Sequence, residues 1–476
     1  MLNRLLFLLL VFVIGTSLDA QTGYDIRVET KNYAHDTLYL GFYYGDKQYL
    51  KDTAIIEKGK FRFQGEEELA PGMYLILLQP DNSFVQLNIN RGKQRMDIKF
   101  DAQDPVESFV SKNDDDNQAF YTYIRYLNKR RPEADELRKQ LELAGSDPDE
   151  KARIEEKLKS INDQVKAFQL KLIKDHPGTL TAALISSFQE IDIPEFTGDE
   201  KEVQVQKYHY FMDHYFDHID FSDERMIRTS FFFQKVNDYV QKHTVQMPDS
   251  LIKAVDRVLK LCQPNEEAFK FFLVHFVNVY AKSNIIGMDA VYVHIVDEYY
   301  AKGAAPWVDE EQLSKMTKNA ASLRPILIGE IAPDIMMQRR DGSKIALHEI
   351  KSPYTVLMFW APDCGHCQKS MPKVVEFYNK FKDKGVELFS VCTKVTDKVP
   401  DCWKMVDEKE MDIWINVVDP YLLSKFSTLY DVRSTPQIFI LDADKKILLK
   451  RLAADQLEDV MQELMDRQEQ LNEQFK

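Results

Sequence analysis

Three patterns of apolar and polar residues follow one another along this chain of 476 residues. Residues 22–104 carry short β-branched and aromatic runs between turn-forming clusters, which predicts a small all-β sandwich. Residues 105–325 repeat apolar positions at helical spacing, which predicts an α-helical domain. Residues 326–476 alternate strand-like and helix-like runs, which predicts an α/β domain with a mixed sheet covered by helices on both faces. The chain is therefore expected to be multidomain.

The individual elements can be placed on these patterns. Six strands are predicted in the first region: Tyr24–Glu29, Thr37–Tyr44, Lys60–Gln64, Met73–Leu78, Phe84–Asn90 and Arg95–Phe100. In the helical region, Pro132, Gly145 and Pro148 are expected to break the long charged pattern Arg130–Ile173. The strands and helices predicted in the last region are Thr355–Trp360, Gln368–Lys382, Val386–Cys392, Leu422–Tyr430, Gln437–Asp442, Ile447–Leu452 and Asp455–Phe475.

The N-terminus has the pattern of a secretory signal peptide over residues 1–20. Met1–Arg4 supplies a positive charge, Leu5–Ile14 is an unbroken apolar run, and a small or polar stretch ends at Ala20. The apolar run is short for a membrane span, so an uncleaved anchor is the weaker alternative. We expect export and a mature chain without a membrane span.

The amino-acid composition disfavours several classes of function for this chain. Apolar residues make up 44% of the chain and the net charge is −14, with no basic block. This balance argues against binding to nucleic acid or to anionic membrane surfaces. Five cysteines are too few for a disulfide scaffold. A close cysteine pair in an exported chain is therefore expected to do redox chemistry rather than act as a staple.

Such a pair occurs in Cys364-Gly365-His366-Cys367, between a predicted strand and a predicted helix. A helix N-terminus favours a thiolate, so Cys364 is predicted to be the nucleophile that attacks a substrate disulfide. Cys367, one turn later, is predicted to resolve the mixed disulfide. The intervening Gly365 and His366 are expected to tune the pair, because an imidazole near the thiolate stabilises the reduced form and makes the site more oxidising.

The last region resembles the thioredoxin-like family, specifically its exported branch related to cytochrome c maturation reductants. Trp360 stands at the family's aromatic position, Pro372 at its helix-kinking proline, and Ser434-Thr435-Pro436-Gln437 matches its cis-proline element. The resemblance implies that Trp360, Thr435 and Pro436 contact substrate, with a cis peptide bond before Pro436 that holds the Thr435 backbone beside Cys364.

The chain departs from the family at several positions. Met358 replaces the buried aspartate of cytoplasmic thioredoxins, Asp363 precedes the first cysteine in place of Trp, and Ser370 replaces a carboxylate of some exported relatives. No proton acceptor for Cys367 is therefore assigned. A peroxide-reducing relative would need Thr or Ser where Ala361 stands, which argues against peroxidase activity.

Several other residues could take part in chemistry, but we expect them to have structural roles. Cys392 is expected to be a small buried hydrophobe, with a disulfide to Cys402 in a loop as the alternative. Cys262 is expected to be buried and unpaired. His209, His214 and His218 lie in one predicted helix, yet no metal site is expected because a catalytic Glu is missing. The run Asp114-Asp115-Asp116 is expected to be a solvated linker or helix cap, with calcium as the weaker alternative.

The whole layout also resembles exported thioredoxin-like proteins of Bacteroidetes type, with an N-terminal β-domain and a helical middle domain of unknown function. The resemblance implies a periplasmic thiol–disulfide oxidoreductase without a cofactor, acting on protein thiols and disulfides and served by an unidentified redox partner. A homodimer through the N-terminal domains is a further expectation. The alternative is a binding or scaffold protein of the cell envelope, in which the thioredoxin-like domain is accessory.

Overall fold

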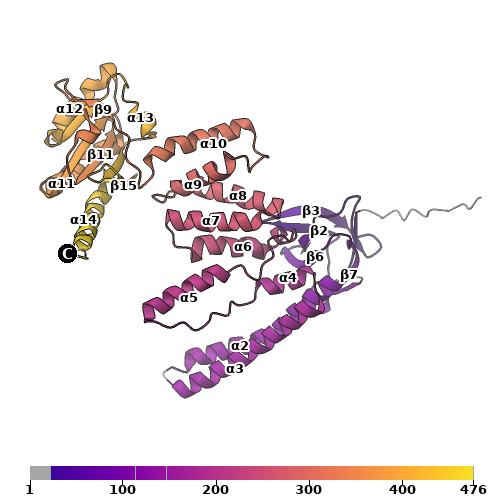
Figure 1. Ribbon diagram of the computed structural model, residues 1–476. Helices are drawn as coiled ribbons and strands as arrows, with labels where there is room; N and C mark the ends of the chain where they lie inside the picture. The colour runs from indigo at the N-terminus through magenta and orange to yellow at the C-terminus, as the bar shows by residue number, and fades with distance from the viewer. Residues whose placement is uncertain (1–22, 113, 146, 475–476) are drawn as a thin grey trace, which may run out of the picture. The chain divides into compact units, whose positions relative to one another are not determined.

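A computed structural model describes residues 23–112, 114–145 and 147–474, and Figure 1 shows its secondary structure. The predicted signal peptide, residues 1–20, lies outside these described residues. The chain forms two compact units, one ending at Tyr239 and the other beginning at Val240. Within the described part of the chain, no helix combines the length and the apolar character that a membrane crossing requires.

The first unit begins with two four-stranded sheets, whose strand orders are β4-β1-β7-β8 and β3-β2-β5-β6. Alternation along β1 shows how the sequence builds them: Ile26 and Val28 are fully buried, whereas Arg27 between them is exposed. The strands are β1 Tyr24–Lys31, β2 Thr37–Tyr44, β3 Lys47–Ile55, β4 Phe61–Gly65, β5 Gly72–Leu78, β6 Ser83–Ile89, β7 Arg95–Asp101 and β8 Val110–Lys112. All six predicted strands are therefore present.

Two of these strands were absent from the prediction. The first five side chains of β3 are all exposed, so this edge strand lacks the alternation that marks a half-buried strand. The strand β8 pairs antiparallel with β7 inside the region that was predicted to be helical. Its three residues are too few for any periodic pattern to show.

Helices complete the first unit: α1 Pro105–Ser108, α2 Asp115–Leu143, α3 Pro148–Asp175, α4 Leu180–Ser187, α5 Glu200–His214 and α6 Ser230–Asp238. Figure 1 shows α2 and α3 as a long hairpin of two helices. The side chain of Asp114 caps α2 by accepting a hydrogen bond from the Asn117 amide. The cap prediction for the Asp run is therefore confirmed, but Asp116 is buried and accepts hydrogen bonds from the amides of Leu180 and Thr181 rather than lying in solvent.

The expected break at Pro132 is wrong, because α2 continues through it. A proline inside a helix removes one backbone donor. Here α2 packs against neighbours on both sides of that position. Tyr123 packs with Leu172 before the proline, and Ala134 packs with Ile154 after it. Tertiary packing thus overrides the local preference.

Helices also open the second unit, and they are α7 Pro248–Cys262, α8 Glu266–Ala281, α9 Asp289–Ile295 and α10 Glu310–Leu323. A π-helical segment, η3 Val296–Tyr300, extends α9 directly. Cys262 ends α7 as a fully buried free thiol, as predicted. Burial raises the pKa of this thiol well above its ordinary range, which makes it chemically inert at neutral pH.

The rest of the second unit is built on a mixed sheet with the strand order β10-β9-β13-β12-β11-β14-β15. The central strand β11 runs parallel to β12 and antiparallel to β14. Met358 and Trp360 of β11 enter one buried apolar cluster, whereas Leu357 and Phe359 enter another. The strands are β9 Met336–Gln338, β10 Lys344–Ala346, β11 Tyr354–Trp360, β12 Val386–Cys392, β13 Ile415–Val418, β14 Gln437–Leu441 and β15 Ile447–Lys450. The predicted two-sided mixed sheet is therefore confirmed.

The helices of this thioredoxin-like fold are α11 Gly365–Phe381, α12 Val399–Glu408, α13 Phe426–Leu429 and α14 Leu457–Gln474. The sequence predicted α11 and α14 to within a few residues. It missed α12, which was taken as a loop, and it missed the short strands β9, β10 and β13. The predicted helix 422–430 is reduced to the single turn of α13, because Leu422 and Lys425 have left-handed backbone angles.

Candidate active site

The cysteine pair lies where β11 passes into α11. Cys364 is the N-cap of α11, and its Sγ accepts a hydrogen bond from the Cys367 amide at 3.3 Å. Cys364 is half-buried, whereas Cys367 is fully buried one turn later. The strand places the first thiol at the open end of the helix, and the helical turn places the second beneath it.

The two thiols have opposite acidities. Partial burial opposes ionisation of Cys364, but hydrogen bonds from Cys367, from the Thr435 side chain and from the His366 amide outweigh it and lower the pKa. Burial, followed by the hydrogen bond with Cys364, raises the pKa of Cys367 to about 12. The outer sulfur is therefore the better nucleophile at neutral pH.

A second segment meets the outer thiol from far along the chain. The peptide bond between Thr435 and Pro436 is cis, as predicted. The Cys364 thiol donates a hydrogen bond to the Thr435 carbonyl oxygen at 3.1 Å. Residues 71 positions apart in the sequence are thus brought into direct contact.

Trp360 has a different place from the one expected. Its side chain is 1% exposed, and its indole N–H donates to the Ser390 hydroxyl at 2.6 Å. A buried indole whose only polar group is already bonded cannot meet a substrate in this conformation. The structure therefore gives Trp360 a packing role between β11 and β12 in place of the predicted substrate contact.

The two residues between the cysteines are both exposed. A Cβ added at Gly365 would meet nothing within 4 Å, so no neighbour requires glycine there. The amide of His366 contributes to the lowered pKa of Cys364. The departures noted in the sequence lie close by: Met358 shares the buried apolar cluster that contains Cys367, and Asp363 forms an ion pair with Lys394 at 2.6 Å.

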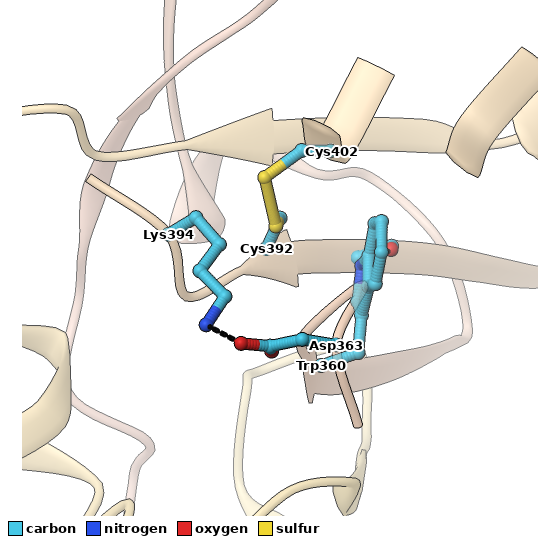
Figure 2. The surroundings of a disulfide bond; sticks show 6 residues. Trp360, Asp363, Cys392, Lys394 and Cys402 are labelled. Carbon is cyan, nitrogen blue, oxygen red and sulfur yellow. Dashed lines mark hydrogen bonds and ion pairs between the residues drawn. A yellow bond between two sulfur atoms is a disulfide. The ribbon is translucent and has the colours of Figure 1, made fainter. Parts of the chain in front are cut away.

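A disulfide joins Cys392 and Cys402, which corrects the expectation that Cys392 is merely a small hydrophobe. Cys392 ends β12 directly beside Trp360 in the parallel register, and Cys402 lies in α12. Both are buried. Figure 2 shows this disulfide together with Trp360 and the Lys394–Asp363 ion pair. The spacing was compatible with a bond, but the sequence assigned Cys402 to a loop and so gave no fixed geometry for it.

The three histidines predicted to lie in one helix of the first unit do not all do so. The helix α5 ends at His214, so His218 lies beyond it and does not share its face. His214 instead lies 2.5 Å from the Asp217 carboxylate. Among the described residues, no group of three or more His, Cys, Asp or Glu side chains is arranged to hold a metal ion.

Three separate parts of the chain match known protein families or domains. Residues 328–450 match the AhpC/TSA family. Residues 24–120 match a domain of unknown function, DUF4369, and residues 147–324 match another, DUF5106. The cysteine pair and the cis-proline element therefore lie in the one matched region that has a described family.

Individual proteins are similar to parts of this chain. Thiol-disulfide oxidoreductase ResA of Bacillus cereus is 31% identical over 144 residues, which cover 29% of this chain and 78% of the relative. A thioredoxin-like protein from Bacteroides caccae is 18% identical and covers 58% of this chain and 99% of its own, with a TM-score of 0.42. The thioredoxin domain of a thiol-disulfide oxidoreductase from Bacteroides vulgatus is 27% identical, covers 29% and 98%, and has a TM-score of 0.27. On the strength of the ResA match, this chain belongs to the thioredoxin-like family of thiol-disulfide oxidoreductases.

Proposed function

We propose that Cys364 and Cys367 are the redox-active pair of this oxidoreductase, and that it exchanges disulfides with protein substrates. The observation that carries the proposal is the position of Cys364. Its half-buried Sγ caps α11, has a lowered pKa and lies 3.1 Å from the Thr435 carbonyl oxygen. Cys367, fully buried and with a raised pKa, suits the resolving role.

The exchange takes two steps. The Cys364 thiolate attacks a substrate disulfide, so that one Cys364–substrate S–S bond forms and the other substrate sulfur leaves as a thiolate, which takes up a proton. Cys367 then loses its proton and attacks Cys364 Sγ. This releases the second substrate thiol and forms the Cys364–Cys367 disulfide. Two electrons pass from the protein to the substrate, and the reverse sequence oxidises a substrate dithiol.

Thr435 and Pro436 would receive the substrate chain. Both are half-buried, and the Thr435 backbone already contacts the nucleophile. An extended substrate segment can pair with such a backbone edge, which would align its disulfide with Cys364. Trp360 is left out of this contact surface because it is buried.

Gly365 and His366 are proposed to tune the pair. A protonated imidazole next to Cys364 would stabilise the thiolate and hence the dithiol form, which raises the reduction potential. His366→Ala keeps the backbone amide that already serves Cys364, so it isolates the side chain. We expect this variant to have a more negative potential than the wild type in equilibrium with a glutathione buffer. An unchanged potential would remove His366 from the proposal.

The site of action is proposed to be a Gram-negative periplasm, reached through cleavage after residue 20, with an unidentified redox partner that restores the pair. We propose three roles for the domains 22–104 and 105–325. They would bind partners, form a dimer or restrict access to the redox domain 326–476. N-terminal sequencing of the protein from a periplasmic fraction tests the export step. Recovery of an uncleaved chain in the membrane fraction would support an anchor instead.

The activity is tested by insulin reduction with the intact mature chain. Cys364→Ser should abolish turnover, and Cys367→Ser should accumulate a mixed disulfide. Cys262→Ala should leave turnover unchanged, because Cys262 is fully buried and does not belong to the apolar cluster around Cys367. Turnover by the Cys364→Ser variant would contradict the assignment of the nucleophile. Inactivity of both the intact chain and the isolated domain 326–476 would favour the scaffold alternative.

A further inference from the structure

A groove of about 400 Å³ lies beside the cysteine pair, along Thr435 and Pro436. We call it the basic groove, because its charged lining consists of the cations Lys369, Lys373 and Arg451 and the single carboxylate Asp455. His366 also lines it. A substrate segment that pairs with the Thr435 backbone would therefore lie against these cations.

Little of this positive charge is compensated within the protein. Lys373 and Asp455 form an exposed ion pair at 3.7 Å. Lys369 and Arg451 have no ion-pair partner among the described residues, and both are exposed. The groove thus carries an excess of positive charge, whereas the full chain has a net charge of −14.

The backbone that carries these cations lies in, or directly after, regular elements. Lys369 and Lys373 are four residues apart in α11 and share one face of that helix. Arg451 has a left-handed backbone with φ of 58°, a conformation that disfavours residues with a side chain. The preceding Lys450 is 1% exposed and donates to the Ile326 carbonyl oxygen at 2.7 Å, which anchors this segment.

Charge is distributed differently around Asp363, the residue before the cysteine pair. A second groove, of about 410 Å³, is lined by Pro362, Asp363 and residues of α12. Two of its four lysines are paired, Lys394 with Asp363 at 2.6 Å and Lys404 with Glu408 at 3.8 Å. Its other charged lining residues are Lys398, Lys409 and Asp401. This second groove thus has one more cation than carboxylates, whereas the basic groove has two more and also contains Thr435 and Pro436. The basic groove is therefore the side expected to select an acidic substrate.

We propose that the basic groove selects substrates whose reactive cysteines are flanked by Asp or Glu in an extended segment. This inference rests on the proposed function, since it takes Cys364 as the nucleophile. Lys369 and Arg451 would act as specificity residues that attract the acidic segment, while Thr435 pairs with its backbone. Positive charges that line a concave site raise the association rate of a negatively charged ligand and lower that of a positively charged one.

The test uses two synthetic peptides that each contain one intramolecular disulfide, flanked on both sides by Glu in one peptide and by Lys in the other. The intact chain, with Cys364 and Cys367 reduced, is mixed with excess peptide, and the second-order rate of peptide reduction is measured. We expect the Glu peptide to react about tenfold faster than the Lys peptide at low salt. The ratio should shrink towards one at high salt, because screening weakens exposed charges.

Variants identify the cations responsible. The double variant Lys369→Gln with Arg451→Gln should lose most of the preference, chiefly through slower reaction of the Glu peptide. The matched control is Lys344→Gln with Lys382→Gln, two exposed lysines that do not line either groove, and it should keep the preference. Equal rates for the two peptides in the wild type would overturn the inference, whereas failure to reduce either peptide would overturn the proposed function itself.

Discussion

Lys450 and Asp289 form an ion pair in the interior of the second unit, with side chains that are 1% and 8% exposed. The lysine ends β15 of the sheet, and the aspartate begins α9. The helices that open this unit and the thioredoxin-like sheet are therefore joined by two charges that water hardly reaches.

Breaking this pair on one side should be costly. Lys450→Met leaves the Asp289 carboxylate buried without its cation, which we expect to lower the free energy of unfolding of the second unit by about 3–5 kcal/mol. Combining it with Asp289→Leu should recover most of the loss, because no buried charge remains. Chemical denaturation measures both effects, with Lys446→Met on the same hairpin as the exposed control. A single variant as stable as this control would show that the pair is not buried in solution.

The acidities of the two active-site thiols predict selective alkylation. The lowered pKa of Cys364 makes its thiolate available below the ordinary range of a thiol, whereas Cys367, with a pKa of about 12, stays protonated. Iodoacetamide at pH 7 should therefore label Cys364 first. The labelling rate should rise with pH, and the midpoint of this rise should lie below about 8.5, the ordinary thiol pKa. Mass spectrometry of the digested protein reads the order, and initial labelling of Cys367 would contradict it.

The same shift gives a pH dependence of stability in the reduced protein. Because the pKa of Cys364 is lower in the folded than in the unfolded state, the unfolded state binds more protons between the two values. This contribution to stability is fully present above the unfolded value of about 8.5 and is lost as the pH falls through the folded value. The reduced Cys364→Ala variant should lack it. The difference in unfolding free energy between the two proteins, measured from pH 6 to pH 9, should therefore grow with pH.

Ser390 should stabilise the fold through its hydrogen bond with the Trp360 indole. Ser390→Ala leaves the buried indole N–H without its acceptor, which is expected to cost about 1–3 kcal/mol of unfolding free energy. Ser427→Ala, at an exposed position of α13, is the control and should change little. Urea denaturation followed by tryptophan fluorescence measures both. Equal stability of the two variants would mean that water reaches the indole in solution.

The disulfide between Cys392 and Cys402 should survive when the active-site pair is reduced, because both of its sulfurs belong to buried residues. Mild reduction followed by alkylation in denaturant should then give three labelled cysteines, and five would contradict the prediction. Cys392→Ala with Cys402→Ala should lower the unfolding free energy by about 2–3 kcal/mol, since the bond closes a short loop of the unfolded chain. Denaturation of this double variant under oxidising conditions measures that loss.

The redox centre could be predicted from the sequence because its parts are local. A buried strand, a cysteine at a helix start and a hairpin after Pro436 each leave a mark within a few neighbouring residues. The sequence also indicated the cis peptide bond, through its resemblance to a family rather than through periodicity. These parts then needed only one long-range contact, between Cys364 and Thr435, to form the site.

What the sequence missed depends on tertiary packing. Pro132 lies within a helix because a partner helix packs on both sides of it, and β3 is exposed along its edge. The burial of Trp360 depends on Ser390, which comes 30 residues later on the neighbouring strand. The bond of Cys402 required α12, whose short amphipathic pattern was taken for a polar loop. None of these partners can be identified from the residues nearby in the chain.

Because the space around Gly365 is open, the redox properties of the site can be changed independently of the stability of the fold. No neighbour lies within 4 Å of a Cβ at this position, and His366 is exposed, so neither residue contributes to the buried clusters that hold the fold. Substitutions of the two residues between the cysteines should therefore change the reduction potential of the pair with little effect on the free energy of unfolding. The dipeptide can be treated as an interchangeable module, and a graded series of oxidants and reductants should be obtainable from one unchanged scaffold.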